Sequence, residues 1–412
     1  MLVGAPATTI ASRVTAGDVS AAEVFLGHVA AIDPAVNAIV ATAKFVAPVA
    51  GPLCGVPFTV KDNIAAAGLP FVAGVAERRD EIADSDAVAV ARLRAAGAVL
   101  LGKTNLPPWG GGIETDNEVF GRTNNPHALD RSAGGSSGGA AASVAEGSSA
   151  FALGTDSGAS VRLPAHFCGV AALKPSAGRV PIAGVIDDAG PLGPLRDPRT
   201  QIGVVARTVA DLALVLSVID GRAGAPWPPA VGPAAAAARL SPAAAPALPA
   251  LSADVRRLRV ALLADDGISR PDADTAQVVA DAAEALASLG AHIVEDPPPA
   301  GGHALTEEVW ASYGADAISY DLLGRWDAYR TAMAAYAEDV DVVLSPVYPT
   351  AAPRHGSVAN HTSYTTPQNM SGWAAVTVRC GSSGGLPVGV QVAAARDEVA
   401  LAAALALEEA FA

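Results

Sequence analysis

The chain has 412 residues, more than the roughly 250–300 over which a single hydrophobic core keeps growing, so it forms one large unit or two domains. This length excludes a short binding module. Apolar residues make up 51% of the chain and charged residues 17%, which provides for a packed core and excludes general disorder. The 41 acidic residues outnumber the 27 basic ones, and the net charge of −14 argues against nucleic acid as a partner.

The cysteines and the apolar segments predict a cytoplasmic protein without a membrane span. The three cysteines are Cys54, Cys168 and Cys380. They form no CxxC pair, so neither a zinc site nor a disulfide framework is expected, and a reducing compartment fits best. Residues 1–30 lack the pattern of a secretory signal. The best candidate for a membrane span, residues 204–219, is interrupted by Arg207 and Asp211 and is shorter than the ~20 residues required.

The first third of the chain predicts helices followed by a strand. Residues 7–31 have a helical rhythm, and Ser20 is placed to begin a second helix at Ala21. Residues 55–60 form a short apolar segment that runs into Lys61, so this lysine is expected at a strand end. Lysine is scarce here, with only four in the chain, and a rare lysine can be retained for its chemistry or simply reflect genomic composition.

Helix and strand patterns then alternate. Residues 85–96 predict a helix capped by Ser85, and residues 98–101 predict a buried strand after Gly97. A Gly-Gly-Ser-Ser-Gly-Gly run at 134–139 precedes an alanine-rich helix, and a further strand leads into the turn 155–160. Repeated helix and strand patterns favour an α/β architecture.

A tract rich in alanine and proline, at about residues 222–252, predicts a low-complexity insert or linker. The alternation resumes after it, with strands at 258–263, 291–294 and 340–345 and a helix at 274–289. We therefore expect residues 1–412 to form a single domain that this insert interrupts.

Two motif matches fail in their context. Residues 97–104 fit the Walker A pattern, but an apolar strand occupies the position of the phosphate-binding loop. Residues 134–138 fit the G-x-S-x-G nucleophile elbow, but the preceding residues 124–131 are polar and contain a proline, so the strand that this motif requires is missing. None of the seven histidines has a sequence context that indicates a catalytic base.

A hydrolase without a catalytic histidine needs another base, a nucleophile and backbone donors for an oxyanion. Lysine can act as the base only when it is neutral, so burial or nearby positive charge must lower its pKa. The turn 155–160 consists of small residues whose N–H groups can converge on one point, with a hydroxyl at its end. Taken alone, this pattern is more typical of a glycine-rich turn that closes a strand.

Three segments in order change this interpretation. They are Lys61-Asp62-Asn63, the run 134–139, and Gly154-Thr155-Asp156-Ser157-Gly158-Ala159-Ser160-Val161-Arg162-Leu163-Pro164-Ala165. In order and spacing they resemble the amidase signature family. Supporting segments also match, at 97–105, 123–126, 169–179 and 385–391, and the resemblance spans roughly residues 10–215 and 256–412.

The resemblance implies an α/β/α sandwich with a mixed β-sheet core flanked by helices, and a Ser–cisSer–Lys triad. Ser160 is then the nucleophile, Ser136 the bridging serine and Lys61 the base, with a cis peptide bond between residues 135 and 136. The oxyanion would be held by the backbone amides of Ser157, Gly158, Ala159 and Ser160. No metal and no organic cofactor is expected.

Further residues receive roles from the same resemblance. Asp156 and Arg162 are expected to pair beneath the nucleophile turn, with a structural role favoured over direct catalysis. Ser137 could belong to the proton relay or to the structural surroundings. Trp109 and Gly110 fall where the family lines its substrate cleft, although Trp109 could equally fill the core.

The chain also departs from the family pattern. Ala159 replaces a glycine before the nucleophile, which requires a backbone angle that alanine can reach. Trp373 and Arg379 stand where prolines are common, and we expect them to reshape the cleft. Trp109, Phe71 and Trp373 suggest an apolar or aromatic substrate.

The function predicted from the sequence is therefore hydrolysis of small amides, and of carbamates (urethanes) or esters, through a serine acyl-enzyme. The expected partner is a small-molecule substrate, with no nucleic acid and no membrane, and the protein is expected to be a monomer or homodimer. One alternative is the glutaminase component of a glutamyl-tRNA amidotransferase. Another is a non-catalytic binding protein on an amidase scaffold.

Overall fold

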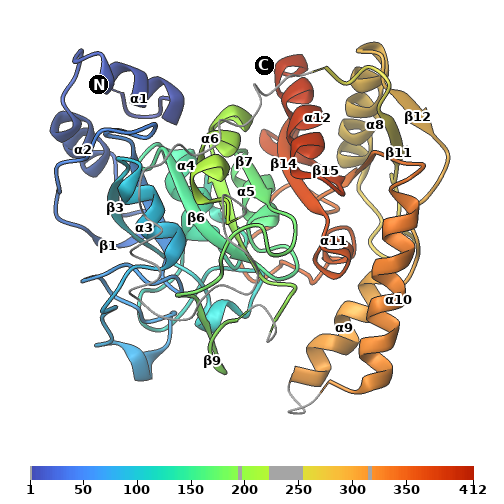
Figure 1. The fold of residues 1–412 in the computed structure, drawn as a ribbon, viewed down its shortest axis with the longest axis horizontal. Coiled ribbons are helices and arrows are strands. Elements are labelled where there is room, and N and C mark those ends of the chain that lie inside the picture. The colour runs from blue at the N-terminus through green and yellow to red at the C-terminus, as the bar shows by residue number, and fades with distance from the viewer. Residues whose placement is uncertain (1, 194–196, 222–253, 314–317) are drawn as a thin grey trace.

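The computed structural model describes residues 2–193, 197–221, 254–313 and 318–412 (Figure 1). The predicted insert at 222–252 lies outside these residues. Strands from both sides of it belong to one mixed sheet of eleven strands in the order β1-β3-β2-β6-β10-β7-β14-β15-β13-β11-β12. The strands are β1 (Ile39–Thr42), β2 (Pro57–Lys61), β3 (Val99–Thr104), β6 (Phe151–Asp156), β7 (Ala171–Lys174), β10 (Gln201–Ala206), β11 (Arg259–Leu262), β12 (His292–Val294), β13 (Val342–Pro346), β14 (Ala374–Ser383) and β15 (Leu386–Ala394).

Two hairpins lie outside the large sheet. They are formed by β4 (Asn124–Asn125) with β5 (Ala128–Ser132), and by β8 (Ile186–Asp187) with β9 (Gly190–Pro191).

Helices cover both faces of the sheet, as the predicted sandwich requires. They are α1 (Ala7–Thr15), α2 (Ala21–Ala30), α3 (Val88–Ala95), α4 (Gly138–Glu146), α5 (Arg162–Cys168), α6 (Val209–Ile219), α8 (Ala273–Ser288), α9 (Gly302–Tyr313), α10 (Tyr320–Tyr336), α11 (Thr366–Ser371) and α12 (Asp397–Ala410). Figure 1 shows α9 and α10 running side by side at one end of the molecule.

The alternation of side chains along the central strands divides them between two layers. Leu173 and Val204 pack in one core with α3, α6, α8 and α12. Their neighbours Ala172 and Val205 pack in another core with α4 and α5. Successive residues of a strand point to opposite faces, so these strands are buried on both sides. The predicted α/β/α sandwich with a mixed sheet is therefore confirmed.

Strand register brings the chemically important segments to one edge of the sheet. Strand β2 runs parallel to β6, with Val60 opposite Leu153, so both strands end at the same edge. Strand β10 runs antiparallel to β6, with Gln201 opposite Asp156, so it begins where β6 ends. Lys61, the turn after Asp156 and the segment before Gln201 therefore meet at this edge.

The N-terminal predictions hold in part. Helix α2 begins after Ser20, whose hydroxyl accepts the Glu23 N–H (3.2 Å) while the Glu23 carboxylate accepts the Ser20 N–H (2.9 Å). The prediction that Ser85 caps a helix was wrong, because α3 begins only at Val88 and has no side-chain cap. The Asp86 carboxylate instead accepts the N–H of Ala67, which holds this segment outside the helix.

The first rejected motif has the backbone that the sequence indicated. For the second, the expectation that no strand precedes it was wrong, because β5 (Ala128–Ser132) lies directly upstream; this strand pairs with β4 outside the large sheet and is mostly not buried. Residues 99–104 form the buried strand β3 rather than a phosphate-binding loop, and residues 134–137 form the turn before α4. The candidate membrane segment 204–219 is divided between β10 and α6. Among the described residues, no helix has the length and apolar character needed to cross a membrane.

Candidate active site

Lys61 occupies the last position of β2, and its side chain is fully buried. Its Nζ lies 2.6 Å from the Ser136 Oγ and 2.8 Å from the Thr155 Oγ1. Burial lowers the pKa of Lys61 to about 7, and the negative charge of Asp156 opposes this shift. A substantial fraction of Lys61 is therefore neutral near pH 7 and can accept a proton.

Ser136 follows a cis peptide bond to Gly135, as predicted, in the turn before α4. The position of Gly135 tolerates no side chain, because a Cβ there would lie 2.7 Å from the Glu114 backbone nitrogen and 2.8 Å from the Gly112 carbonyl oxygen. Close packing of backbone against this turn thus directs the Ser136 hydroxyl toward Lys61.

Ser160 ends the turn between β6 and α5, and its side chain is partly exposed. The Ser137 N–H donates to the Ser160 carbonyl oxygen (3.0 Å), which places Ser160 beside the turn that carries Ser136. Ala159 lies outside the left-handed backbone region, so alanine replaces glycine here without conformational strain. The structure therefore brings the three predicted triad residues to one place.

The hydroxyls of two neighbouring serines bond away from this relay. The Ser137 Oγ donates to the Thr155 carbonyl oxygen (3.3 Å), which favours the structural alternative for Ser137. The Ser157 Oγ lies 2.6 Å from the Thr200 Oγ1, so the start of the oxyanion turn is tied to the segment before β10.

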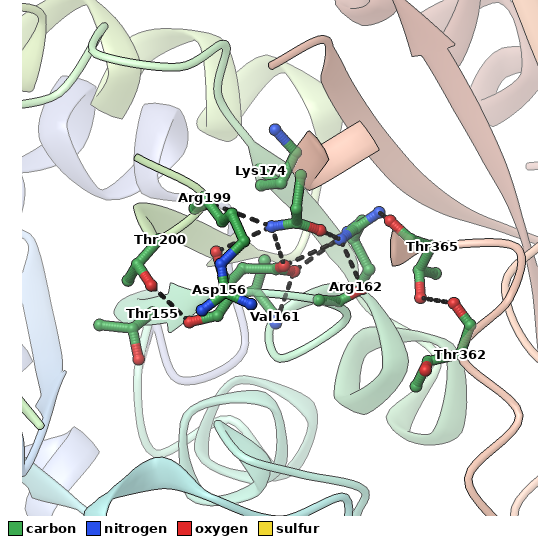
Figure 2. A network of polar contacts seen from close by, with 12 residues as sticks. Thr155, Asp156, Val161, Arg162, Lys174, Arg199, Thr200, Thr362 and Thr365 are labelled. Atoms are coloured by element: carbon green, nitrogen blue, oxygen red, sulfur yellow. Dashed lines mark hydrogen bonds and ion pairs between the residues drawn. The ribbon is translucent and has the colours of Figure 1, made fainter. Parts of the chain in front are cut away.

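Asp156 and Arg162 form the ion pair that the sequence predicted, and both side chains are fully buried (Figure 2). Two guanidinium nitrogens donate to the two carboxylate oxygens, at 3.0 and 2.8 Å, and Nη2 also donates to the Gly158 carbonyl oxygen (2.9 Å). Burial alone would raise the pKa of Asp156, but Arg162 lowers it to about 2. The remaining guanidinium contacts are with the Thr365 carbonyl (2.6 Å), Gln391 Oε1 (2.8 Å) and Asn369 Oδ1 (2.5 Å).

Several residues of this network had no role in the sequence prediction. Thr155 accepts from Lys61, and the Asn369 amide donates to the Asp156 carbonyl oxygen (3.1 Å). Thr155 and Gln391 lie inside segments that match the family, and this match was the sequence feature that could have pointed to them. Asn369 lies on a helix 213 positions further along the chain than Asp156, so only the folded chain reveals it.

Trp109 and Gly110 belong to the short segment 108–110, which reaches the relay of Lys61 and Ser136. Trp109 is half-buried and has a left-handed backbone (φ 57°), and its N–H donates to the Ala73 carbonyl oxygen (2.8 Å). A Cβ on Gly110 would lie 3.5 Å from the Ser136 Oγ and 3.6 Å from the Lys61 Nζ. The backbone at Gly110 therefore lies next to the relay.

A second buried lysine supports this loop. The Lys103 Nζ donates to the Ile64 carbonyl oxygen (2.5 Å) and lies 3.6 Å from the Asp62 carboxylate. The other carboxylate oxygen of Asp62 accepts the N–H groups of Val72 and Ala73, at 3.0 Å each. This ion pair thus holds the segment to which Trp109 is bonded.

The expectation that Trp373 reshapes the cleft was wrong, whereas the same expectation for Arg379 stays a prediction. Trp373 is buried in a core cluster, where its ring stacks on Tyr336 at a centroid distance of 6.2 Å. Arg379 is exposed at a register shift between β14 and β15. Phe71, also named as a substrate contact, lies against the Arg78 guanidinium and the Lys103 ammonium, each 5.6 Å from the ring centroid.

The contacts of His166 differ from those of a catalytic base. The His166 ring bonds to the carbonyl oxygens of Gly389 and Thr350, which gives it a structural role. In the part of the chain that the structure describes, no three His, Cys, Asp or Glu side chains are arranged to hold a metal ion.

Comparison with known proteins shows to which protein family the chain belongs. A family model described as Amidase matches residues 30–324 and 321–401. An acylamidase of Rhodococcus erythropolis is 34% identical, over 94% of this chain and 91% of that protein. The chain therefore belongs to the Amidase family, and it is an amidase-signature hydrolase, as its motifs predicted.

Two further similarities span most of the chain. A glutamyl-tRNA(Gln) amidotransferase subunit of Thermus thermophilus is 35% identical, over 98% of this chain and 96% of that protein. The solved structure of a 6-aminohexanoate cyclic dimer hydrolase complexed with substrate has a TM-score of 0.81 at 28% identity, over 100% of this chain and 98% of that one.

The buried Asp156–Arg162 pair yields a stability prediction. In Arg162→Met the Asp156 carboxylate would stay buried without its cation, so we expect the free energy of unfolding to fall by about 3–5 kcal/mol. Urea denaturation followed by circular dichroism would measure this change. Arg325→Met, which removes an exposed ion pair with Glu308, is the control and should cause no measurable change. Equal losses in the two variants would contradict the prediction.

Proposed function

We propose that the protein hydrolyses small amides and carbamates through an acyl-enzyme on Ser160, with Ser136 as the bridging serine and Lys61 as the base. The contact between the buried Lys61 Nζ and the Ser136 Oγ, at 2.6 Å, carries this proposal. The lowered pKa of Lys61 and the partly exposed position of Ser160 support it. All three residues belong to one chain, so a monomer and a homodimer are both compatible with the mechanism.

In the first half-reaction, Ser160 attacks the carbonyl carbon and a new C–O bond forms. The Ser160 proton passes to Ser136, whose own proton passes to neutral Lys61. The carbonyl electrons move to oxygen, where the amides of Ser157, Gly158, Ala159 and Ser160 stabilise the negative charge. Lys61 then returns its proton through Ser136 to the leaving nitrogen, the C–N bond breaks, and the amine departs.

In the second half-reaction, water attacks the acyl-enzyme. The same relay accepts a proton from water and later returns one to the Ser160 oxygen, so that the acid is released and the enzyme is restored. A carbamate that loses its amine in the first half-reaction would release a carbonic monoester, which loses carbon dioxide. Asp156 and Arg162 take no part in these transfers and hold the oxyanion turn in place.

The substrate class follows from the surroundings of the relay. Trp109 lies half-buried beside Gly110, and the relatives include an acylamidase and a cyclic amide hydrolase. These observations support small amides with apolar or aromatic groups. Carbamates are included because the same relay can protonate their leaving nitrogen.

Covalent labelling tests the proposed nucleophile. We expect a fluorophosphonate to modify the wild-type protein at Ser160, located by peptide mass spectrometry, and to leave Ser160→Ala unmodified. Lys61→Ala should label far more slowly and lose on the order of 10³-fold in kcat/KM, because no base then activates the serine. Lys61→Ala with wild-type activity would exclude the proposed base.

The pH dependence of activity tests the lysine. Because the base acts only when it is deprotonated, kcat/KM should rise about tenfold per pH unit below about pH 7 and level off above it. Lys174→Met is a matched control, since burial also lowers the pKa of Lys174 to about 7 while its Nζ donates to the Pro175 carbonyl oxygen. This variant should keep the same inflection, and a shifted inflection would point to Lys174 instead.

The similarity to an amidotransferase component favours a second candidate, a glutaminase that works with partner proteins. We expect the isolated protein to hydrolyse acyl p-nitroanilides and to show little glutaminase activity. The reason is that the apolar indole of Trp109 suits an aromatic leaving amine better than it suits ammonia, the leaving group of glutamine. Nitroaniline release and ammonia release measure the two activities. Glutamine hydrolysis that appears only with the other amidotransferase components, without anilide turnover, would support this second candidate.

A non-catalytic binding protein is the third candidate. Such a protein has no need for an activated serine, so rapid labelling at Ser160 would exclude it. The buried contact between the Lys61 Nζ and the Ser136 Oγ argues against this candidate, because catalysis needs a base beside a hydroxyl and binding does not.

A further inference from the structure

The indole of Trp310, on α9, packs against the oxyanion turn. A Cβ on Gly158 would lie 2.8 Å from the Trp310 Cζ2 and 3.0 Å from its Cη2, so the benzo edge of the indole touches the backbone of this turn. Trp310 is half-buried, so part of the residue remains exposed. No sequence motif pointed to this residue.

The segment before β10 holds the indole from another side. The Arg199 guanidinium lies 5.9 Å from the centre of the Trp310 ring. The Asp197 carboxylate fixes this guanidinium, accepting from Nε at 2.9 Å and from Nη2 at 3.2 Å. Asp197 also accepts from the Thr200 hydroxyl (2.6 Å), which in turn contacts Ser157. One short segment thus orients both the oxyanion turn and the tryptophan.

The proton relay defines the opposite side of the site, and this step rests on the proposed function. The leaving nitrogen must take its proton from Ser136, so the amine side of the substrate faces Ser136 and Gly110. The carbonyl oxygen occupies the oxyanion turn. The acyl substituent must therefore extend away from Ser136. Trp310, on α9, lies against Gly158, a residue of the oxyanion turn.

We propose that Trp310 forms the wall of the acyl-binding side of the site and selects substrates with a flat apolar acyl group, such as an aromatic one. An indole offers a broad apolar surface for an aryl ring, and the contact with Arg199 restricts its movement. Trp109, beside Gly110, forms the corresponding wall on the amine side.

A substrate panel tests this assignment. The kcat/KM values of wild-type protein, Trp310→Ala and Trp310→Phe would be measured on p-nitroanilides that share the leaving group and differ in the acyl group, from acetyl to benzoyl. We expect the benzoyl-to-acetyl ratio to fall about tenfold in Trp310→Ala and to change little in Trp310→Phe. Trp109→Ala is the crossed control, and it should alter preference among leaving amines while leaving the acyl ratio unchanged.

Each outcome has a distinct meaning. An unchanged or increased benzoyl-to-acetyl ratio in a folded Trp310→Ala would overturn the role of Trp310 as the acyl-side wall. If the wild-type protein turns over the anilides but is not labelled at Ser160, only the proposed nucleophile would be overturned. A wild-type protein that cleaves none of the anilides would overturn both. The acyl ratio is read from turnover, so it does not depend on which serine is labelled.

A double variant tests the contact itself. Gly158→Ala should lose activity, because its new methyl group would meet the indole, and Trp310→Ala in the same chain should restore part of it. Gly158 has no left-handed backbone angle, so alanine is excluded there by the indole rather than by conformation. A double variant no more active than Gly158→Ala alone would show that Trp310 does not touch the turn, which would overturn the inference.

Discussion

The buried guanidinium of Arg162 joins the two halves of the sheet at the active site. It donates to both carboxylate oxygens of Asp156 and to the carbonyl oxygen of Gly158. It also reaches Thr365, the residue before α11, and Gln391 on β15. Taking this charge out of water is costly unless every donor finds a partner, and here two of the partners lie 203 and 229 positions away in the chain. The shape of the oxyanion turn therefore depends on the C-terminal half being folded against it.

The roles of the buried lysines also depend on the partners that the folded chain gives them. The chain has four lysines, and three of them, Lys61, Lys103 and Lys174, are fully buried beside the active site or its supporting loops. Burial lowers the pKa of each, to about 7 for Lys61 and Lys174 and about 8 for Lys103. Of these three, Lys61 contacts a serine hydroxyl, whereas Lys103 lies near a carboxylate and Lys174 donates to a carbonyl. Contact geometry, and not the pKa alone, separates the candidate base from the structural lysines.

The elements predicted from the sequence are largely those of the structure, because periodic apolar patterns and glycine turns act locally. The strand ending at Lys61 and the helix after Ser20 are examples. The errors occurred where a distant segment competes with a local signal. Asp86 bonds the Ala67 amide and thereby delays helix α3, and the core around Tyr336 takes up Trp373, an aromatic residue that the sequence placed in the cleft.

The amino-acid sequence by itself determined the α/β class, the order of the motifs and the residue types able to carry a serine–lysine relay, because these are properties of short segments and their spacing. Only the tertiary structure decided which lysine meets a hydroxyl, that Asn369 and Gln391 complete the network around Arg162, and that Trp310 faces Gly158. These contacts join residues far apart in the chain, and their distances and burial arise only when the strands pair in register and bring the ends of β2 and β6 to one edge of the sheet.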